Sequence, residues 1–163
     1  MGLMDASVTL KKLTEKFPDA VVGTHNYRGD DTAIVKKEKI RDICLFLRDD
    51  PDLLYNFMMD LTVVDYLGRD PRFEVVYHLY SLPHNRRVRI KALVPESDLT
   101  IDSVVSVWVA ADWFEREAYD MYGVVFTGHP NLRRILLYEG FEGHPLRKDY
   151  PLKKRQPLIG PVN

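Results

Sequence analysis

The sequence is poor in cysteine and in long apolar runs, and each shortage excludes a class of protein. Its one cysteine, Cys44, excludes an internal disulfide, a zinc site built on several cysteines and a four-thiolate iron–sulfur cluster. Cys44 lies in an apolar run, Ile43 to Leu47, which predicts a buried core residue and not a reactive thiol. Any redox carrier that works with this chain therefore belongs to another protein.

Targeting and nucleotide-binding segments are also missing. No stretch approaches the ~18 uninterrupted apolar residues that a transmembrane helix needs. Residues 1–17 carry four charged side chains between Lys11 and Lys16 and no apolar centre of the secretory kind, so we expect no export by that route. A Gly-x-Gly-x-x-Gly fingerprint and a P-loop are both absent, which argues against nucleotide binding by this chain.

What is present fits one globular domain with an extension. The 163 residues have room for one core, and the 45% apolar and 29% charged residues are close to the average of globular proteins. The net charge of −1 hides an asymmetry, because residues 131–163 carry seven basic and three acidic side chains. This difference predicts a boundary between a folded α/β body, residues 1–127, and a C-terminal extension, residues 128–163.

Apolar periodicity predicts alternating helices and strands in the body. The spacing of Leu10, Leu13 and Phe17 predicts a first helix, capped by Ser7 or Asp5. The other expected elements are strands over 20–27 and 32–36, a helix over 37–49, strands over 57–66, 73–81 and 86–94, and a last helix from a cap on Asp102 or Ser103 to Tyr122. The order αββαβββα predicts an α+β fold of two layers, in which helices pack mainly on one face of a mixed five-stranded sheet.

Alternation along the strands predicts which side chains face the core. Met59, Leu61 and Val63 are expected on one face of the strand over 57–66. On the opposite, outer face of the sheet we expect a basic row, which consists of Arg87, Arg89 and Lys91. The favoured interpretation of this row is a solvated sheet face, and a protein-docking or nucleic-acid surface is the alternative.

The last helix combines a core stripe with a polar face that is rich in aromatic side chains. The core stripe is expected to consist of Trp108, Ala111, Phe114, Ala118 and Met121. Asp112, Arg116 and Asp120 follow one another at i,i+4 and are expected to pair along another face. Trp113 and Tyr119 lie among these charges and off the core stripe, which indicates a contact with another protein more than open water.

The carboxylates and histidines of this region do not form a recognisable catalytic set. Glu115 and Glu117 are two residues apart and therefore point about 200° away from each other on a helix. Glu117 and Asp120 are spaced to bind a metal together, but a matching Glu-x-x-His helix is absent. His129 and His144 each occupy a Gly-His-Pro triplet, for which a local capping or bridging role is the favoured interpretation.

The C-terminal extension differs in composition from a disordered tail. It mixes Leu, Ile, Tyr and Phe with Arg and Lys, whereas disordered tails are poor in apolar side chains. Such a segment buries itself poorly on its own. We therefore expect an extended tail that lies along another protein and is mobile in the free chain.

Three sequence motifs around this boundary resemble a known family. They are Glu115-Arg116-Glu117-x-x-Asp120-Met121-Tyr122-Gly123, Gly128-His129-Pro130-x-Leu132-Arg133-Arg134-Ile135-Leu136 and Gly143-His144-Pro145-Leu146-Arg147-Lys148-Asp149-Tyr150-Pro151-Leu152. Together they resemble the signature of the C subunit, or 30 kDa subunit, of respiratory complex I. The resemblance is highly specific from Ala111 to Leu152, and before that it rests on the order of the elements.

The resemblance implies a non-redox, structural subunit in the peripheral arm of proton-translocating NADH:quinone oxidoreductase. It implies that FMN, the iron–sulfur clusters and the quinone are bound by partner subunits, and that this chain binds no cofactor or metal. The chain is then enzymatic only as part of the complex, and we expect the isolated chain to be inactive. The implied form is the stand-alone subunit and not the fusion with the D subunit.

The implied partners are other subunits of the complex. They are the D (49 kDa) subunit, the B subunit and, as a further candidate, the I subunit. The implied location is the cytoplasmic face of the bacterial membrane, where association with the membrane is indirect, through these partners. Direct binding of nucleic acid is not expected.

The resemblance also implies roles for the residues of the motifs. A charge network that fixes the helix end and the departing chain is expected from Glu115, Arg116, Glu117 and Asp120, with Gly123 as the helix stop. The expected partner contacts are His129, Arg133, Arg134, His144, Arg147 and Lys148. None of these residues is expected to act in catalysis.

Other assignments stay open on the sequence. A homologous subunit of a membrane-bound, energy-converting nickel–iron hydrogenase, or of a related ferredoxin- or F420-dependent complex, shares this motif. A basic nucleic-acid-binding module is the alternative from another class, and the net charge of −1 argues against it. A stand-alone hydrolase that uses Glu117 and Asp120 ranks third.

Overall fold

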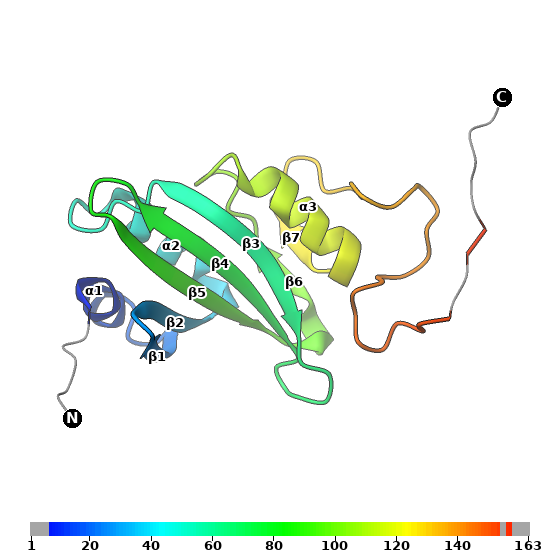
Figure 1. Cartoon of the computed structure of the whole chain (residues 1–163), viewed down its shortest axis with the longest axis horizontal. Helices are drawn as coiled ribbons and strands as arrows, with labels where there is room; N and C mark the ends of the chain where they lie inside the picture. The colour runs from blue at the N-terminus through cyan, green and yellow to red at the C-terminus, as the bar shows by residue number, and fades with distance from the viewer. Residues whose placement is uncertain (1–6, 154–155, 158–163) are drawn as a thin grey trace.

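The computed structural model of the chain describes residues 7–153 and 156–157. The elements of this part of the chain follow one another as shown in Figure 1. They are α1 (Val8–Lys16), β1 (Val21–Tyr27), β2 (Asp30–Lys36), the short 3₁₀ helix η1 (Lys37–Lys39), α2 (Ile40–Asp49), β3 (Phe57–Asp65), β4 (Phe73–Ser81), β5 (Arg86–Val94), η2 (Glu96–Asp98), β6 (Thr100–Asp102), α3 (Ala111–Tyr122) and β7 (Val125–Thr127).

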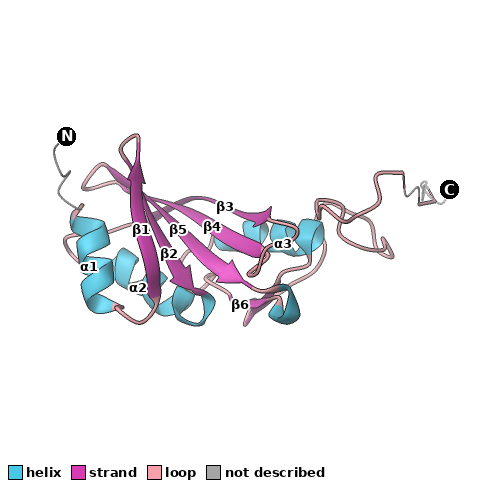
Figure 2. Cartoon of the chain, turned by 90° about the horizontal axis from the view of Figure 1, so that it is seen from below, coloured by secondary structure: helices cyan, strands magenta, loops and turns pink. Residues whose placement is uncertain are grey.

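A five-stranded sheet in the order β1-β2-β5-β4-β3 forms the centre of the fold. Strands β2 and β5 run parallel, and the other neighbours pair antiparallel, so the sheet is mixed. Helices α1 and α2 lie on one side of this sheet, and α3 lies beside β3 (Figures 1 and 2). The structure confirms the predicted α+β class, the mixed five-stranded sheet and the expected order of its elements.

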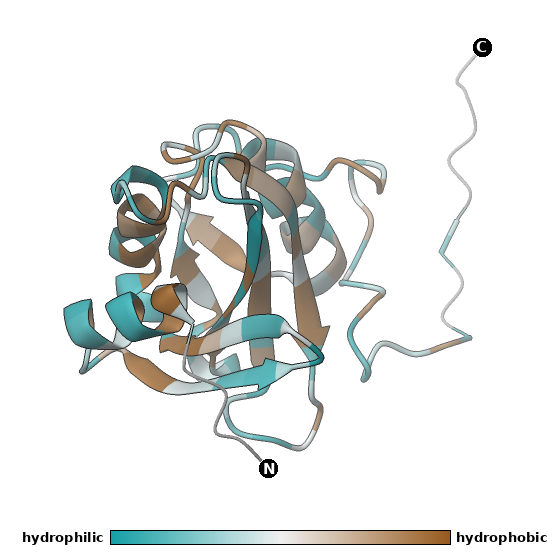
Figure 3. Cartoon of the chain, turned by 60° about the vertical axis from the view of Figure 1, so that its left-hand side comes forward, coloured by the Kyte–Doolittle hydropathy of each residue, from teal (hydrophilic) through white to brown (hydrophobic). Residues whose placement is uncertain are grey.

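The core lies between the sheet and the helices. Every second side chain of β4 is buried, from Phe73 through Val75 and Tyr77 to Leu79, and β5 alternates in the same way. Hydrophobic residues accordingly gather in the strands of the large sheet (Figure 3). Cys44 of α2 is fully buried, and burial raises the pKa of its thiol, which confirms the predicted core role. Within the described ranges, no helix is both long and apolar enough to cross a membrane.

A β-bulge in β3 changes which methionine faces the core. Met59 is 42% exposed, whereas Met58 is 3% exposed. The pairing of β3 with β4 shifts between Met58 and Asp60, so an extra residue is inserted and the alternation reverses there. The prediction that Met59 shares a face with Leu61 and Val63 is therefore wrong, because those two side chains are buried and Met59 is not.

The last helix begins later than predicted. Asp102 ends strand β6, which pairs in parallel with β7 as a second, two-stranded sheet, and α3 starts only at Ala111. The predicted cap on Asp102 or Ser103 is wrong, because the two strands of this small sheet lie far apart in the sequence and helical periodicity does not reveal their pairing. The predicted end at Tyr122 is confirmed, since Gly123 follows with a positive φ of 80°.

Candidate functional site

The carboxylate of Asp120 holds the first part of the C-terminal segment against α3. Oδ2 of this fully buried residue accepts hydrogen bonds from the backbone nitrogens of Ile135, Leu136 and Leu137, at 3.0, 2.8 and 2.9 Å. Oδ1 accepts one from Nη1 of Arg134 at 2.7 Å. Burial alone would raise the pKa of Asp120, but these hydrogen bonds outweigh it and the pKa lies below its usual range. An ionised carboxylate thus fixes three consecutive residues of the tail.

Two arginines add further contacts between the helix and the tail. Arg134 also donates to the carbonyl oxygen of Gly143 at 3.1 Å, so it joins two turns of the tail. Arg116 donates to the carbonyl oxygens of Arg133 and Arg134, at 3.2 and 3.3 Å. The predicted row of pairs from Asp112 through Arg116 to Asp120 is wrong, because Asp120 turns inward and Arg116 reaches the tail.

Both histidines of the Gly-His-Pro triplets hydrogen-bond to the backbone of α3. Nε2 of His129 lies 3.1 Å from the carbonyl oxygen of Asp112, and its Nδ1 accepts from the backbone of Asn131. Nδ1 of His144 lies 3.0 Å from the carbonyl oxygen of Asp120. Burial lowers the pKa of His144, which favours the neutral ring. These contacts match the bridging role that the triplets predicted.

Gly123 is required where the tail returns to the helix end. A Cβ atom at Gly123 would lie 2.6 Å from Nε2 of His144 and 3.0 Å from Nη2 of Arg147. Nε of Arg147 donates to the carbonyl oxygen of Tyr122, which closes the end of the helix. Glycine is therefore needed both for its positive φ and for this close approach.

A buried ion pair fastens the later part of the tail to the sheet. Arg72 is 3% exposed and forms two hydrogen bonds of 2.8 Å with Asp65, whose second oxygen also accepts from the backbone nitrogen of Lys148. Nη1 of Arg72 also reaches Glu96 and Asp149. Hydrogen bonds to Arg72, the largest cause, lower the pKa of Asp65. This pair is not predicted from the sequence, although strand alternation places Asp65 on the buried side with Leu61 and Val63.

Glu115 lies on the opposite side of α3 from the tail and is fully buried. Its two oxygens accept hydrogen bonds from Oγ of Ser103 at 2.6 Å and from the backbone nitrogen of Val104 at 2.7 Å. Burial is the largest influence and raises the pKa of Glu115 to about 7, although the two hydrogen bonds lower it. Glu115 thus anchors the segment before α3, whereas Asp120 anchors the segment after it.

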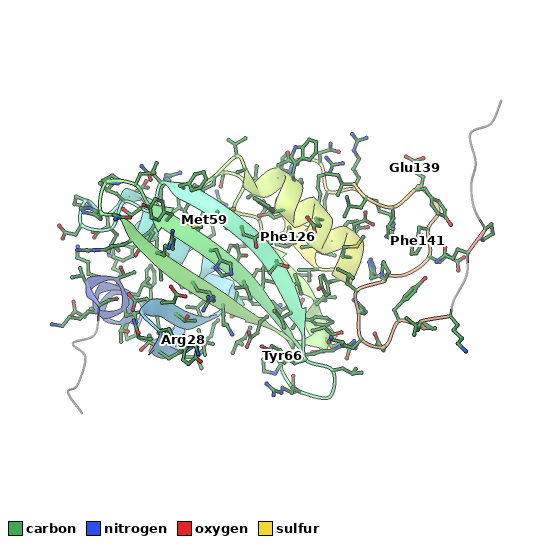
Figure 4. All side chains as sticks on the ribbon, in the orientation of Figure 1. Arg28, Met59, Tyr66, Phe126, Glu139 and Phe141 are labelled. Atoms are coloured by element: carbon green, nitrogen blue, oxygen red, sulfur yellow. The ribbon has the colours of Figure 1, made fainter. Side chains whose placement is uncertain are left out.

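The remaining charges and several apolar side chains face outward. Glu117, Arg133 and Lys148 are exposed. Trp113 of α3 is 69% exposed, as expected for a residue off the core stripe. The tail adds exposed leucines, which are Leu136, Leu146 and Leu152. Phe141 and Glu139 lie on the part of the tail that loops away from the sheet (Figure 4).

The junction between α3 and the tail offers structural anchors and little that suggests chemistry. Glu115 binds the segment before α3 and Asp120 binds the segment after it, on opposite sides of the helix, so the two carboxylates do not act as a pair. Among residues 7–153 and 156–157, histidine, cysteine and carboxylate side chains nowhere gather in a group of three or more that would suit a metal ion. The arrangement is structural, because the buried carboxylates hold neighbouring segments of the chain against α3.

Comparisons with known proteins agree with the motif. Residues 33–156 match the family described as respiratory-chain NADH dehydrogenase, 30 Kd subunit. The C subunit of NADH-quinone oxidoreductase from Citrifermentans bemidjiense is 54% identical over 151 residues, which are 91% of this chain and 92% of that protein. The same subunit from Roseiflexus sp. is 49% identical over 149 residues, 91% of this chain and 86% of that one.

Two solved structures share the fold. The trypsin-resistant fragment (1-134) of Nqo5 superposes with a TM-score of 0.63 at 31% identity and covers 77% of this chain and all of that fragment. A chain of the membrane-bound sulfane sulfur reductase, an archaeal respiratory membrane complex, superposes with a TM-score of 0.73 at 25% identity, over 88% of this chain and 84% of that one. The motif, the family match and the relatives agree: this chain belongs to the family of the 30 kDa subunit of the respiratory-chain NADH dehydrogenase.

Proposed function

We propose that this chain is a non-redox, structural subunit of proton-translocating NADH:quinone oxidoreductase, in which it braces the D (49 kDa) and B subunits of the quinone-reducing module. The observation that carries this proposal is the buried carboxylate of Asp120, which fixes three consecutive backbone nitrogens of the tail. The Asp120 carboxylate satisfies the backbone donors of the tail and so stabilises its path along α3. The side chains on the outer side of the tail then remain available to a partner.

The described part of the tail fits a partner-binding segment. Its polar backbone groups are anchored on α3 and β3, while Leu136, Leu146 and Leu152 are 63%, 50% and 99% exposed. A pre-positioned segment loses less conformational entropy on binding than a free one. The proposed organisation is therefore an α/β domain, residues 1–127, followed by a partner-binding extension, residues 128–163.

Within the complex, the cofactors are assigned to partners. FMN, the iron–sulfur clusters and the quinone are bound by other subunits, and the I subunit is a further candidate neighbour. The chain then lies on the cytoplasmic face of the bacterial membrane and is attached through these subunits. The chain contributes to turnover by holding the subunits of the module in position, and the isolated chain is inactive.

Affinity isolation from native membranes tests this proposal. The tagged full-length chain is recovered after gentle solubilisation, and its partners are identified by mass spectrometry. Recovery of the flavin-bearing and cluster-bearing subunits together with D and B supports the proposal. Recovery of nucleic acid, or of none of these subunits, contradicts it.

A second candidate function is a place in a related respiratory complex. The similarity to the sulfane sulfur reductase chain, with a TM-score of 0.73, favours it. The same isolation separates the two candidates, because a large subunit with nickel-binding cysteine pairs, or a ferredoxin-dependent partner, would replace the NADH-oxidising subunits.

A further inference from the structure

The outer face of the five-stranded sheet, which faces away from α1 and α2, carries aromatic and basic side chains at one end. Strand pairing places Tyr80 opposite both Arg87 and Phe57, and side chains directly opposite one another share a face. Arg89 lies one row further in, opposite Thr32 and His78. This end of the sheet runs from Tyr27 on the edge strand β1 to Phe57 on the opposite edge strand β3. We refer to it as the basic aromatic corner, which consists of Tyr27, Arg28, Phe57, Tyr80, Arg87 and Arg89.

Two of the three arginines of this corner rest on aromatic rings. The guanidinium of Arg28 lies 5.2 Å from the ring centre of Tyr27, and that of Arg87 lies 5.5 Å from the ring centre of Tyr80. Neither takes part in an ion pair within the part of the chain that the structure describes. A guanidinium that is stacked on a ring keeps its donors free and oriented, which suits a carboxylate.

Nearby acids neutralise the corner only in part. The closest approach of Asp30 to Arg89 is 3.9 Å, at the limit of an ion pair, and Asp30 is exposed. Asp60 of β3 lies one row further in, opposite His78. Further along the face, Lys91 is paired with Glu74 at 2.9 Å. The unpaired positive charge is therefore confined to one end of the sheet.

A hollow lies beside these arginines on the outer face of the sheet. Met59, His78, Arg87 and Arg89 line it together with two carboxylates, Asp30 and Asp31, of which Asp31 accepts a hydrogen bond from Asn26. Exposed apolar groups flank it, because Tyr27 is 64% exposed, Phe57 51% and Met59 42%. Figure 4 shows Arg28 beside the turn between β1 and β2, and Met59 on β3. Tyrosine, arginine and methionine are enriched at the centres of protein interfaces.

We infer that the basic aromatic corner binds a short acidic segment of a partner protein, at a surface separate from the junction between α3 and the tail. Because the unpaired charge is confined, it fits a few carboxylates of a peptide. A nucleic-acid backbone needs a longer run of free bases, and the acids Asp30, Asp60 and Glu74 interrupt such a run here. This inference rests on the proposed function in one respect, namely that the chain works inside a multi-subunit assembly.

Site-directed photo-crosslinking tests this inference in the assembled complex. A benzophenone amino acid replaces Tyr27 in the tagged full-length chain, in cells that hold no other copy, and the crosslinked peptide is sequenced. We expect a peptide of another subunit with more Asp and Glu than Lys and Arg. A matched probe at Val8 of α1, on the helical side and 46% exposed, should not crosslink to that peptide. A crosslink to nucleic acid, or to a peptide without an acidic excess, would overturn the inference.

Charge reversal gives a second, independent readout. Arg87→Glu should reduce the fraction of the chain that copurifies with the assembly on the order of tenfold. Arg41→Glu, at an exposed arginine of α2 on the other side of the sheet, makes the same charge change and should match the unaltered chain. Thermal unfolding verifies that each variant folds, and Arg28→Glu replaces Arg87→Glu if the latter does not.

The controls separate failure of this inference from failure of the proposed function. If the unaltered chain copurifies with no oxidoreductase subunit, the proposed function is wrong. If the unaltered chain copurifies normally, and Arg87→Glu and Arg41→Glu do so equally well, the acidic-segment inference is wrong.

Discussion

Asp65 and Arg72 form a bidentate ion pair at the end of the sheet, with two hydrogen bonds of 2.8 Å and side chains that are 0% and 3% exposed. The backbone nitrogen of Lys148, 83 residues further along the chain than Asp65, donates to the same carboxylate at 2.8 Å. Arg72 in turn reaches Asp149 at 2.9 Å. This buried ion pair therefore connects the tail to the sheet.

Removal of one partner of this pair should destabilise the whole domain. Asp65→Asn leaves the Arg72 guanidinium buried without its main counter-charge, so we expect the free energy of unfolding in urea to fall by about 3 kcal/mol. Asp42→Asn is the control, because the Lys39–Asp42 pair is 55% exposed on both sides and its loss should change stability by less than ~0.5 kcal/mol. Equal losses in the two variants would contradict the structural role of the buried pair.

Loss of the Asp120 anchor should expose the tail to proteases. In Asp120→Asn the side chain no longer accepts three backbone hydrogen bonds as an anion, so we expect cleavage by trypsin after Arg133, Arg134 and Arg147 to be at least ~10-fold faster. Electrophoresis and mass spectrometry of the fragments measure this. Glu117→Gln removes an exposed charge from the same helix and should leave the rate unchanged. Cleavage of Asp120→Asn at the rate of the unaltered chain would show that the anchor is unimportant.

Stability should decrease as pH rises through the titration of Glu115. The pKa of this group is about 7 in the folded chain and 4.5 as its ordinary value, so between these values the folded state binds more protons than the unfolded state. The stabilisation is complete below 4.5 and is lost as pH rises through 7, with a total on the order of 3 kcal/mol. Urea unfolding at a series of pH values measures the slope.

Variants at two glutamates identify the source of this slope. Glu115→Gln carries no titrating proton and should lose that part of the slope. Glu117→Gln changes an exposed residue and should keep it. If Glu115→Gln keeps the full slope, the buried glutamate is not its cause.

A methyl group at Gly123 should disturb the closure of the tail. Gly123→Ala must tolerate a φ of 80° and a Cβ that lies 2.6 Å from His144, so we expect a loss of about 2 kcal/mol in the free energy of unfolding. Gly128→Ala is the matched control, because φ is 82° there and nothing lies within 4 Å of the new Cβ. The control should show only the backbone strain, about 1 kcal/mol. A double variant of Gly123→Ala and His144→Ala should regain the part of the free-energy loss by which Gly123→Ala exceeds Gly128→Ala.

Loss of the Arg116 side chain should reduce assembly more than intrinsic turnover. Arg116 donates to the carbonyl oxygens of Arg133 and Arg134, so Arg116→Ala loosens the start of the tail. We expect a several-fold lower yield of complex from membranes, and quinone reductase activity that falls in proportion. Native electrophoresis and activity assays on the same membranes measure both quantities. A normal yield with lost turnover would indicate a direct catalytic role instead.

The helices and strands of the main sheet are predictable because local periodicity specifies them. The alternation from Phe73 to Leu79 and the helical spacing of Leu10 and Leu13 each need only neighbouring residues. The wrong predictions concern places where residues distant in the sequence determine the local structure. Periodicity misplaces Met59 because a bulge depends on the pairing of β3 with β4, and it misplaces the start of α3 because β6 pairs with β7.

The fold class, the family motif and the burial of Cys44 are predictable from the amino-acid sequence alone, because these follow from composition, short-range pattern and the identity of residues. The role of each charged side chain, by contrast, depends on which distant residues the fold brings next to it. Asp120, placed by its spacing on a polar face, is buried because the returning tail supplies four hydrogen-bond donors to it. Asp65 and Arg72 belong together with Lys148 because strand pairing and the path of the tail bring them into contact. A buried charge is stable only where such partners converge, and that convergence is a property of the folded chain.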